Sequence, residues 1–141
     1  MTARQPDLMI IDDSEDQQQL MQNVCKMIEP NLQIITAECG AVALKYLRAQ
    51  GQGQLPKVIL LDLRMPGMSG QEVLSELKSD LHLKRIPVCI FSNADLETEI
   101  CDCYERGANF YFKKPTGLVQ LKKFLEHFSG IWFKFASVCP N

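Results

Sequence analysis

The 141-residue sequence contains no long hydrophobic run, no surplus of basic residues and no cysteine pair at metal-binding spacing. A membrane-spanning helix needs about 20 consecutive apolar residues, so we expect no membrane partner. The 15 basic and 17 acidic residues are interspersed and give a formal charge of -2. This pattern lacks the basic stripe by which proteins bind nucleic acid, so we expect no nucleic acid partner either.

The cysteines and the N-terminal segment exclude further classes. The six cysteines lack C-x-x-C spacing, and several fall within apolar patterns, where a reduced thiol serves as a small hydrophobe. Cys101 and Cys103 would not face each other on a helix, which argues against a metal site. The first seven residues carry no apolar run typical of a secretory signal, so we expect a cytoplasmic protein. A hydrophobic content of 46% fits one domain with one core.

The sequence does contain a regular alternation of short apolar runs and helical patterns. We predict strands at residues 8–11, 32–36, 58–61, 87–91 and 109–112. Apolar residues at helical spacing follow each strand and predict five helices, marked by Leu20, Val24 and Ile28; Ala41, Leu44 and Leu47; Val73, Leu74 and Leu77; Leu96 and Ile100; and Leu118, Leu121, Leu125 and Phe128. This alternation predicts an α/β fold with a parallel sheet and helices on both faces.

Residues capable of chemistry follow four of these strands. Asp12 and Asp13 end the first strand, Asp62 the third, Ser92 the fourth and Lys114 the fifth. The carboxyl ends of parallel strands meet at one sheet edge, where open α/β folds bind ligands. Three converging carboxylates repel one another and need a hard divalent cation, for which an all-oxygen site suits Mg²⁺. With lysine and serine contacting a phosphoryl group, Asp62 could attack phosphorus and form an acyl phosphate.

Each residue also has a simpler interpretation. Asp62 could start a turn before Pro66 and Gly67, and Asp12 could start a loop. Ser92 could cap a strand end, and Lys114 could be one of two solvated lysines before a proline. Only their joint occurrence at one sheet edge favours a phosphoryl-transfer site.

Four motifs resemble the receiver domains of two-component response regulators, over residues 7–128. They are the acidic pair, a D-x-x-M-P-G-x-x-G run from Asp62, the hydroxyl of Ser92, and G-A-x-x-Y-x-x-K-P at 107–115. The resemblance implies a flavodoxin-like (βα)5 doubly wound fold with strand order 2-1-3-4-5.

The resemblance also implies a role for each site residue. Asp62 is expected to be the phosphoacceptor, and Lys114 to contact the phosphoryl group. Mg²⁺ is expected to bind Asp13, Asp62 and the main-chain carbonyl of Arg64, with Asp12 holding it largely through water. Ser92 and Tyr111 would form the switch pair, although Tyr111 could also be a core aromatic.

The implied function is that of a stand-alone response regulator and not an enzyme. A sensor histidine kinase would phosphorylate Asp62, Ser92 would move towards the phosphoryl group, and Tyr111 would fill the vacated space. The surface of the fourth helix, fifth strand and fifth helix would then bind a partner, or the group would be relayed to a histidine phosphotransfer protein.

Two positions depart from the family pattern. Asn93 replaces a residue that is usually small, and could narrow access to Asp62 or contact the phosphoryl group. Arg64 adds a cation at the rim, which could steer an anionic donor, although a solvated side chain is the simpler interpretation.

The C-terminal segment is the least typical part. We divide the chain into a receiver domain at 1–128 and an apolar extension at 129–141. Residues 131–135 carry too many large apolar side chains for a solvated terminus, so they either pack back or cover another subunit, and we favour a homodimer. The Trp132 segment and Cys139-Pro140 resemble regulators that partner phytochrome-type histidine kinases.

Three other functions share features with this sequence. Haloacid-dehalogenase-type phosphatases carry D-x-D, where this chain has Arg64 in place of the second aspartate. A flavodoxin-like electron carrier needs a Ser/Thr/Gly-rich phosphate loop, where this chain is acidic at 12–16. A receiver-like interaction module that is not phosphorylated remains the main alternative.

Overall fold

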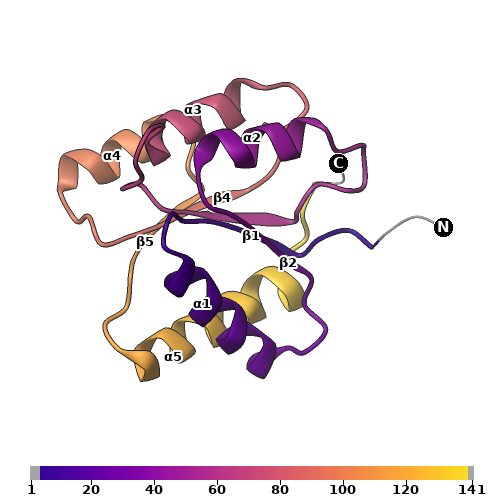
Figure 1. The fold of residues 1–141 in the computed structure, drawn as a ribbon, viewed down its shortest axis with the longest axis vertical. Coiled ribbons are helices and arrows are strands. Elements are labelled where there is room, and N and C mark those ends of the chain that lie inside the picture. The colour runs from indigo at the N-terminus through magenta and orange to yellow at the C-terminus, as the bar shows by residue number, and fades with distance from the viewer. Residues whose placement is uncertain (1–3, 140–141) are drawn as a thin grey trace.

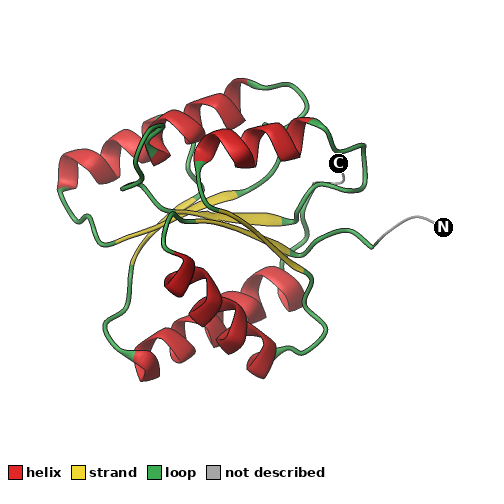
Figure 2. Ribbon diagram, in the orientation of Figure 1, coloured by secondary structure: helices red, strands yellow, loops and turns green. Residues whose placement is uncertain are grey.

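The computed structural model describes residues 4–139 and contains one five-stranded parallel sheet between two layers of helices (Figures 1 and 2). The strand order is β2-β1-β3-β4-β5, which confirms the predicted order. The strands are β1 (Leu8–Ile11), β2 (Ile34–Ala37), β3 (Val58–Leu61), β4 (Val88–Ser92) and β5 (Phe110–Lys113). The helices are α1 (Glu15–Ile28), α2 (Gly40–Arg48), α3 (Gly70–Ser79), α4 (Glu97–Glu105) and α5 (Leu118–Ser129), followed by the π-helix η1 (Gly130–Phe135).

The three central strands are buried along their whole length because helices cover both faces of the sheet. Helices α2, α3 and α4 cover one face, and α1 and α5 cover the other (Figure 1). A separate apolar cluster fills the space under each layer. Continuous apolar runs are typical of strands in such a sandwich, which is why β1 and β3 are plain in the sequence.

Local signals set several helix ends as predicted. Ser14 caps α1, and its hydroxyl accepts a hydrogen bond from the Gln17 N–H at 3.2 Å. Gly107 ends α4 with a φ of +105°, a left-handed conformation that glycine adopts most readily.

Burial confirms the prediction that several cysteines act as small hydrophobes. Cys25, Cys89 and Cys103 are buried, and all six cysteines are free. Burial raises the pKa of Cys89 to about 12 and that of Cys25 to about 11. These thiols therefore stay protonated at neutral pH and are poor nucleophiles.

The second strand begins two residues later than predicted. Leu32 is buried, but its N–H donates to the Glu29 carbonyl in the turn after α1. The carbonyl of the next residue, Gln33, accepts hydrogen bonds from Asp7 and Leu8. Burial made Leu32 resemble a strand residue, although its backbone belongs to the turn.

The C-terminal segment continues α5 as a π-helix and divides its apolar side chains between two environments. Trp132 and Phe133 pack against the cluster beneath α1 and α5, whereas Ile131 and Phe135 are 55% and 85% exposed. Pro140, part of the predicted phytochrome-type resemblance, lies outside the described residues. The segment therefore packs back in part and leaves an apolar surface.

Candidate functional site

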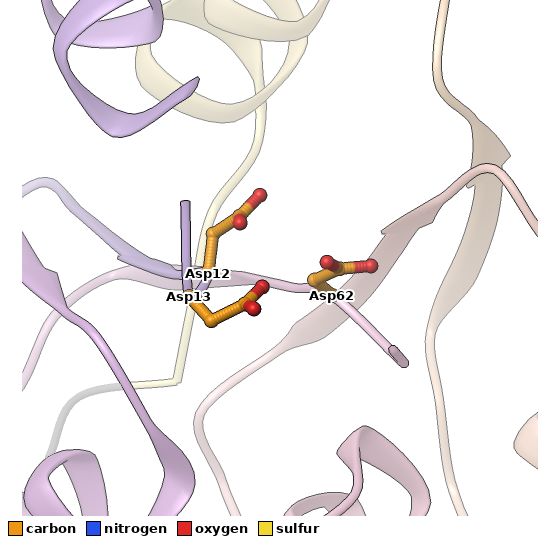
Figure 3. A group of neighbouring side chains, drawn as sticks. All are labelled: Asp12, Asp13 and Asp62. Carbon is orange, nitrogen blue, oxygen red and sulfur yellow. The ribbon is translucent and has the colours of Figure 1, made fainter. Parts of the chain in front are cut away.

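Three aspartates from two adjacent strand ends form an acidic cluster (Figure 3). Ile11 pairs with Leu61 in the parallel register, so the residues that follow them leave the sheet at the same level. Carboxylate oxygens of Asp12, Asp13 and Asp62 lie within 4.8 Å of one another. Asp12 and Asp62 are buried, whereas Asp13 is exposed, so the cluster is open to solvent on the side of Asp13.

The charge of this cluster is only partly balanced. The Lys114 amine lies 3.1 Å from Asp12 Oδ2 and 3.5 Å from Asp62 Oδ2. Burial raises the pKa of Asp62, Lys114 opposes that shift, and Asp12 adds to it. One lysine against three carboxylates leaves two negative charges when all are ionised. An all-oxygen donor set with excess negative charge fits a hard divalent cation such as Mg²⁺.

Close packing of α3 fixes the loop that carries Asp62. The Gly70 N–H donates to the Leu63 carbonyl at 3.0 Å, and a Cβ at Gly70 would lie 2.3 Å from the Asp62 carbonyl oxygen. Only glycine lets the helix begin so near this backbone. Within the loop, the Arg64 N–H donates to Asp62 Oδ1 at 3.5 Å, a long contact that leaves the carboxylate available.

The predicted switch residues share one partner, Ala94. The buried Ser92 hydroxyl accepts a hydrogen bond from the Ala94 N–H at 3.2 Å, and the Tyr111 hydroxyl donates to the Ala94 carbonyl. Burial raises the pKa of Tyr111, so the phenol stays protonated. Asn93, the unusual residue between Ser92 and Ala94, is exposed.

The side chain of Arg64 is 64% exposed, in keeping with the simpler interpretation of a solvated cation, but it also has an ion-pair partner. Its guanidinium lies 2.7 Å from a carboxylate oxygen of Glu99 on α4. No local pattern could have found Glu99, because the partner lies 35 residues away in sequence and meets Arg64 only through the packing of α4.

A sequence profile described as the response regulator receiver domain matches residues 8–126. The chain belongs to this family. The response regulator Rcp1 of Synechocystis sp. is 32% identical over 130 residues, covering 90% of this chain and 88% of Rcp1. The two-component response regulator ARR17 of Arabidopsis thaliana is 30% identical over 128 residues, covering 85% of this chain and 82% of ARR17.

Solved receiver structures share the whole fold. The phosphorylated cyanobacterial phytochrome response regulator RcpA superposes with a TM-score of 0.86 at 31% identity, over 95% of this chain and 98% of RcpA. The Mn²⁺-bound form of Rcp1 superposes with a TM-score of 0.83 at 30% identity, over 95% and 99% of the two chains. Receiver domains bind Mg²⁺ or Mn²⁺ at an acidic site, and this receiver has such a cluster.

The receiver fold brings Asp12, Asp13, Asp62 and Lys114 together at one sheet edge, as predicted. In the described part of the chain, residues 4–139, no helix has the length and apolar character to span a membrane.

Proposed function

We propose that Asp62 of this receiver accepts a phosphoryl group from a phosphohistidine of a partner protein. Phosphorylation then switches a protein-binding surface of the receiver. The observation that carries this proposal is the convergence of Asp12, Asp13 and Lys114 on the Asp62 carboxylate. A buried carboxylate that lies beside one amine and near the solvent opening at Asp13 is suited to in-line attack on phosphorus.

The transfer itself exchanges one bond at phosphorus for another. An Asp62 carboxylate oxygen forms the new O–P bond as the N–P bond to the donor imidazole breaks. The imidazole leaves with the bonding electron pair and takes up a proton. Lys114 lies within reach of Asp62 Oδ2, where its positive charge stabilises the phosphoryl oxygens as their charge grows.

The acidic cluster and the Arg64 carbonyl are the groups that would hold Mg²⁺. When bound, the ion supplies positive charge to the transferring phosphoryl group. The lysine keeps Asp12 oriented at 3.1 Å. The Ser14 N–H fixes the other Asp12 oxygen at 2.9 Å, which leaves little freedom for that side chain.

Ala94 supports the proposed switch. A phosphoryl group on Asp62 offers strong acceptor oxygens, and the Ser92 hydroxyl can donate to one by moving with Ala94. The Tyr111 hydroxyl is bonded to that same residue, so its position is coupled to that of Ser92. The movement would alter the surface of α4, β5 and α5, where a partner protein could bind.

The relatives favour one class of phosphoryl donor. RcpA is named as a cyanobacterial phytochrome response regulator, and this chain shares 31% of its residues over nearly its full length. We therefore propose a phytochrome-type sensor histidine kinase as donor, with a histidine phosphotransfer protein as the alternative relay partner.

Intact mass spectrometry tests the chemistry. We expect incubation with Mg²⁺ and acetyl phosphate to add one phosphoryl group to the wild type, and to add none to Asp62→Asn or to protein treated with EDTA. Glu105→Gln, an exposed substitution on α4, serves as the matched control and should be phosphorylated like the wild type. Absence of an adduct with every donor would instead favour a receiver-like interaction module that is not phosphorylated.

We also propose that the apolar surface formed by β5, α5 and η1 mediates a homodimer. Phe110 and Ile131, which are about half exposed, line an apolar hollow of about 160 Å³ together with Phe112, Phe128 and neighbouring residues. Phe135 of η1 is 85% exposed. A two-fold pair would cover such a patch on both copies.

Sedimentation equilibrium tests the homodimer. We expect Phe135→Ala to raise the dimer dissociation constant at least about tenfold, as removal of an interface anchor does. Leu81→Ala, at an 83% exposed residue beyond the end of α3, is the control and should dimerise like the wild type. A monomeric wild type would contradict the proposal.

A further inference from the structure

An ion pair joins the loop that carries Asp62 to the helix that the switch is proposed to move. Arg64, two residues after Asp62, places its guanidinium 2.7 Å from Glu99 Oε1. Glu99 lies in the first turn of α4. The pair therefore connects the phosphoacceptor loop with α4 by a contact separate from the Ser92 and Tyr111 path.

The two partners are held unequally. The Arg64 side chain is 64% exposed and therefore mostly in contact with solvent, whereas that of Glu99 is only 21% exposed. The second oxygen, Glu99 Oε2, is buried and finds no hydrogen-bond partner among residues 4–139. A partly buried carboxylate with one unsatisfied oxygen depends strongly on the cation that binds its other oxygen. Breaking the ion pair would thus destabilise Glu99 more than Arg64.

We propose that Arg64 and Glu99 form a latch between the phosphoacceptor loop and α4, in which Glu99 is the positioning residue that holds the guanidinium away from Asp62. A phosphoryl group on Asp62 carries about -1.5 to -2 of charge in place of the single negative charge of the carboxylate, and it offers three strong acceptors. It therefore competes with the single carboxylate of Glu99 for Arg64. When the Arg64 side chain moves to bind the phosphoryl group, Glu99 loses its cation, and this loss favours movement of α4. The latch rests on the proposed phosphorylation of Asp62.

Tyr111 lies close enough to sense both charges of the latch. Its pKa is raised first by burial, next by Cys103 and Glu99, and this rise is opposed by Ser92 and then by Arg64. Release of Arg64 would remove the cation that offsets Glu99 beside the phenol. The latch and the hydrogen bond from Tyr111 to Ala94 thus both act at the N-terminal end of α4.

The latch predicts how tightly a phosphoryl mimic binds. We would titrate beryllofluoride into the protein in saturating Mg²⁺ by calorimetry and compare wild type, Glu99→Gln and Glu97→Gln. Glu97 lies in the same turn of α4 and is exposed, so its substitution removes equal charge from the helix. Because Glu99→Gln removes the competitor for Arg64, it should lower the dissociation constant about two- to fivefold, the range expected for a partly exposed ion pair. Glu97→Gln should leave it unchanged.

A double-mutant comparison separates this role from a general effect on the fold. In an Arg64→Gln background, Glu99→Gln should no longer change the dissociation constant. Hydrogen exchange of the α4 amides should be faster in metal-free Glu99→Gln than in metal-free wild type. If the wild type binds beryllofluoride and Glu99→Gln binds it like Glu97→Gln, the latch is wrong and the phosphoacceptor proposal stands. If the wild type binds none, both proposals fail.

Discussion

The carboxylate of Asp62 carries its charge at a cost to folding. Burial is the main reason that its pKa is raised, and the charge of Asp12 adds to the shift. A carboxyl group with a raised pKa in the folded state stabilises the fold below its unfolded pKa. That contribution to stability is lost as the pH rises through the pKa of the folded state. At neutral pH without a cation, the ionised side chain therefore destabilises the receiver.

Substitution of Asp62 should reveal this cost. We expect Asp62→Asn to raise the free energy of unfolding at pH 7 in EDTA by about 1 kcal/mol, and expect the gain to shrink towards pH 4. Urea unfolding across this range measures both effects. Glu105→Gln, at an exposed position, should change stability by less than about 0.5 kcal/mol. A gain of equal size at pH 4 and pH 7 would contradict the argument.

Gly70 offers a second prediction at a single residue. A Cβ at this position would lie 2.6 Å from the Leu63 Cα as well as 2.3 Å from the Asp62 carbonyl oxygen, and backbone atoms cannot yield easily. We expect Gly70→Ala to cost about 1–3 kcal/mol of unfolding free energy and to slow phosphorylation by displacing the Asp62 loop. Chemical denaturation and the mass assay measure the two effects.

Gly51→Ala is the matched control for Gly70. Its added Cβ would meet nothing within 4 Å, so the substitution should leave both stability and phosphorylation near wild type. If the two alanine variants behaved alike, close packing of α3 on the Asp62 loop would not be what requires glycine.

At the scale of elements, η1 extends α5 and covers part of the core. Trp132 contacts Phe128 and Phe110, with ring centroids 6.2 and 6.4 Å apart. Its neighbour Phe133 also packs against the apolar cluster beneath α1 and α5. The segment therefore stabilises the layer formed by α1 and α5, in addition to its proposed role in the homodimer.

Two substitutions in η1 should separate these roles. We expect Trp132→Ala to lower the free energy of unfolding by about 2 kcal/mol, below the value for a fully buried tryptophan because Trp132 is only half-buried. Phe135→Ala, at an 85% exposed residue, should cost less than about 0.5 kcal/mol. Urea titration at a concentration where the protein is monomeric measures both. If both variants lost the same free energy of unfolding, burial of side chains in η1 would not decide their contribution to stability.

For the whole molecule, cation binding and folding are linked through the acidic cluster. Asp12, Asp13 and Asp62 come together only in the folded chain, so an ion that binds them there favours folding. We expect Mg²⁺ at about 100 times its dissociation constant to stabilise the wild type by about 2.7 kcal/mol. The Tm should rise accordingly, and should rise less in Asp62→Asn.

The control for this experiment is potassium chloride at matched ionic strength, because salt alone screens the repulsion between carboxylates. A Tm that rises equally with either salt would show screening in place of a bound ion.

Much of this architecture follows from local pattern. Strands that are buried on both faces have continuous apolar runs, and Ser14 and Gly107 mark helix ends by their own chemistry, so element order and parallel sheet are visible in the sequence. Because parallel strands align their carboxyl ends, the approximate meeting of Asp12, Asp13, Asp62 and Lys114 is visible as well.

The tertiary structure decided the contacts between elements that are distant in the chain. The pairing of Arg64 with Glu99, and the bonding of Tyr111 to Ala94, depend on how α4 packs beside β5 and the Asp62 loop. The division of η1 into a packed Trp132 and an exposed Phe135 depends on the shape of the core beneath α5. The sequence by itself determined the alternating α/β pattern and its acidic edge because those arise from local periodicity and strand alignment, whereas the strand order was implied by the resemblance to receiver domains. Helix packing places individual side chains, and no local pattern encodes that geometry.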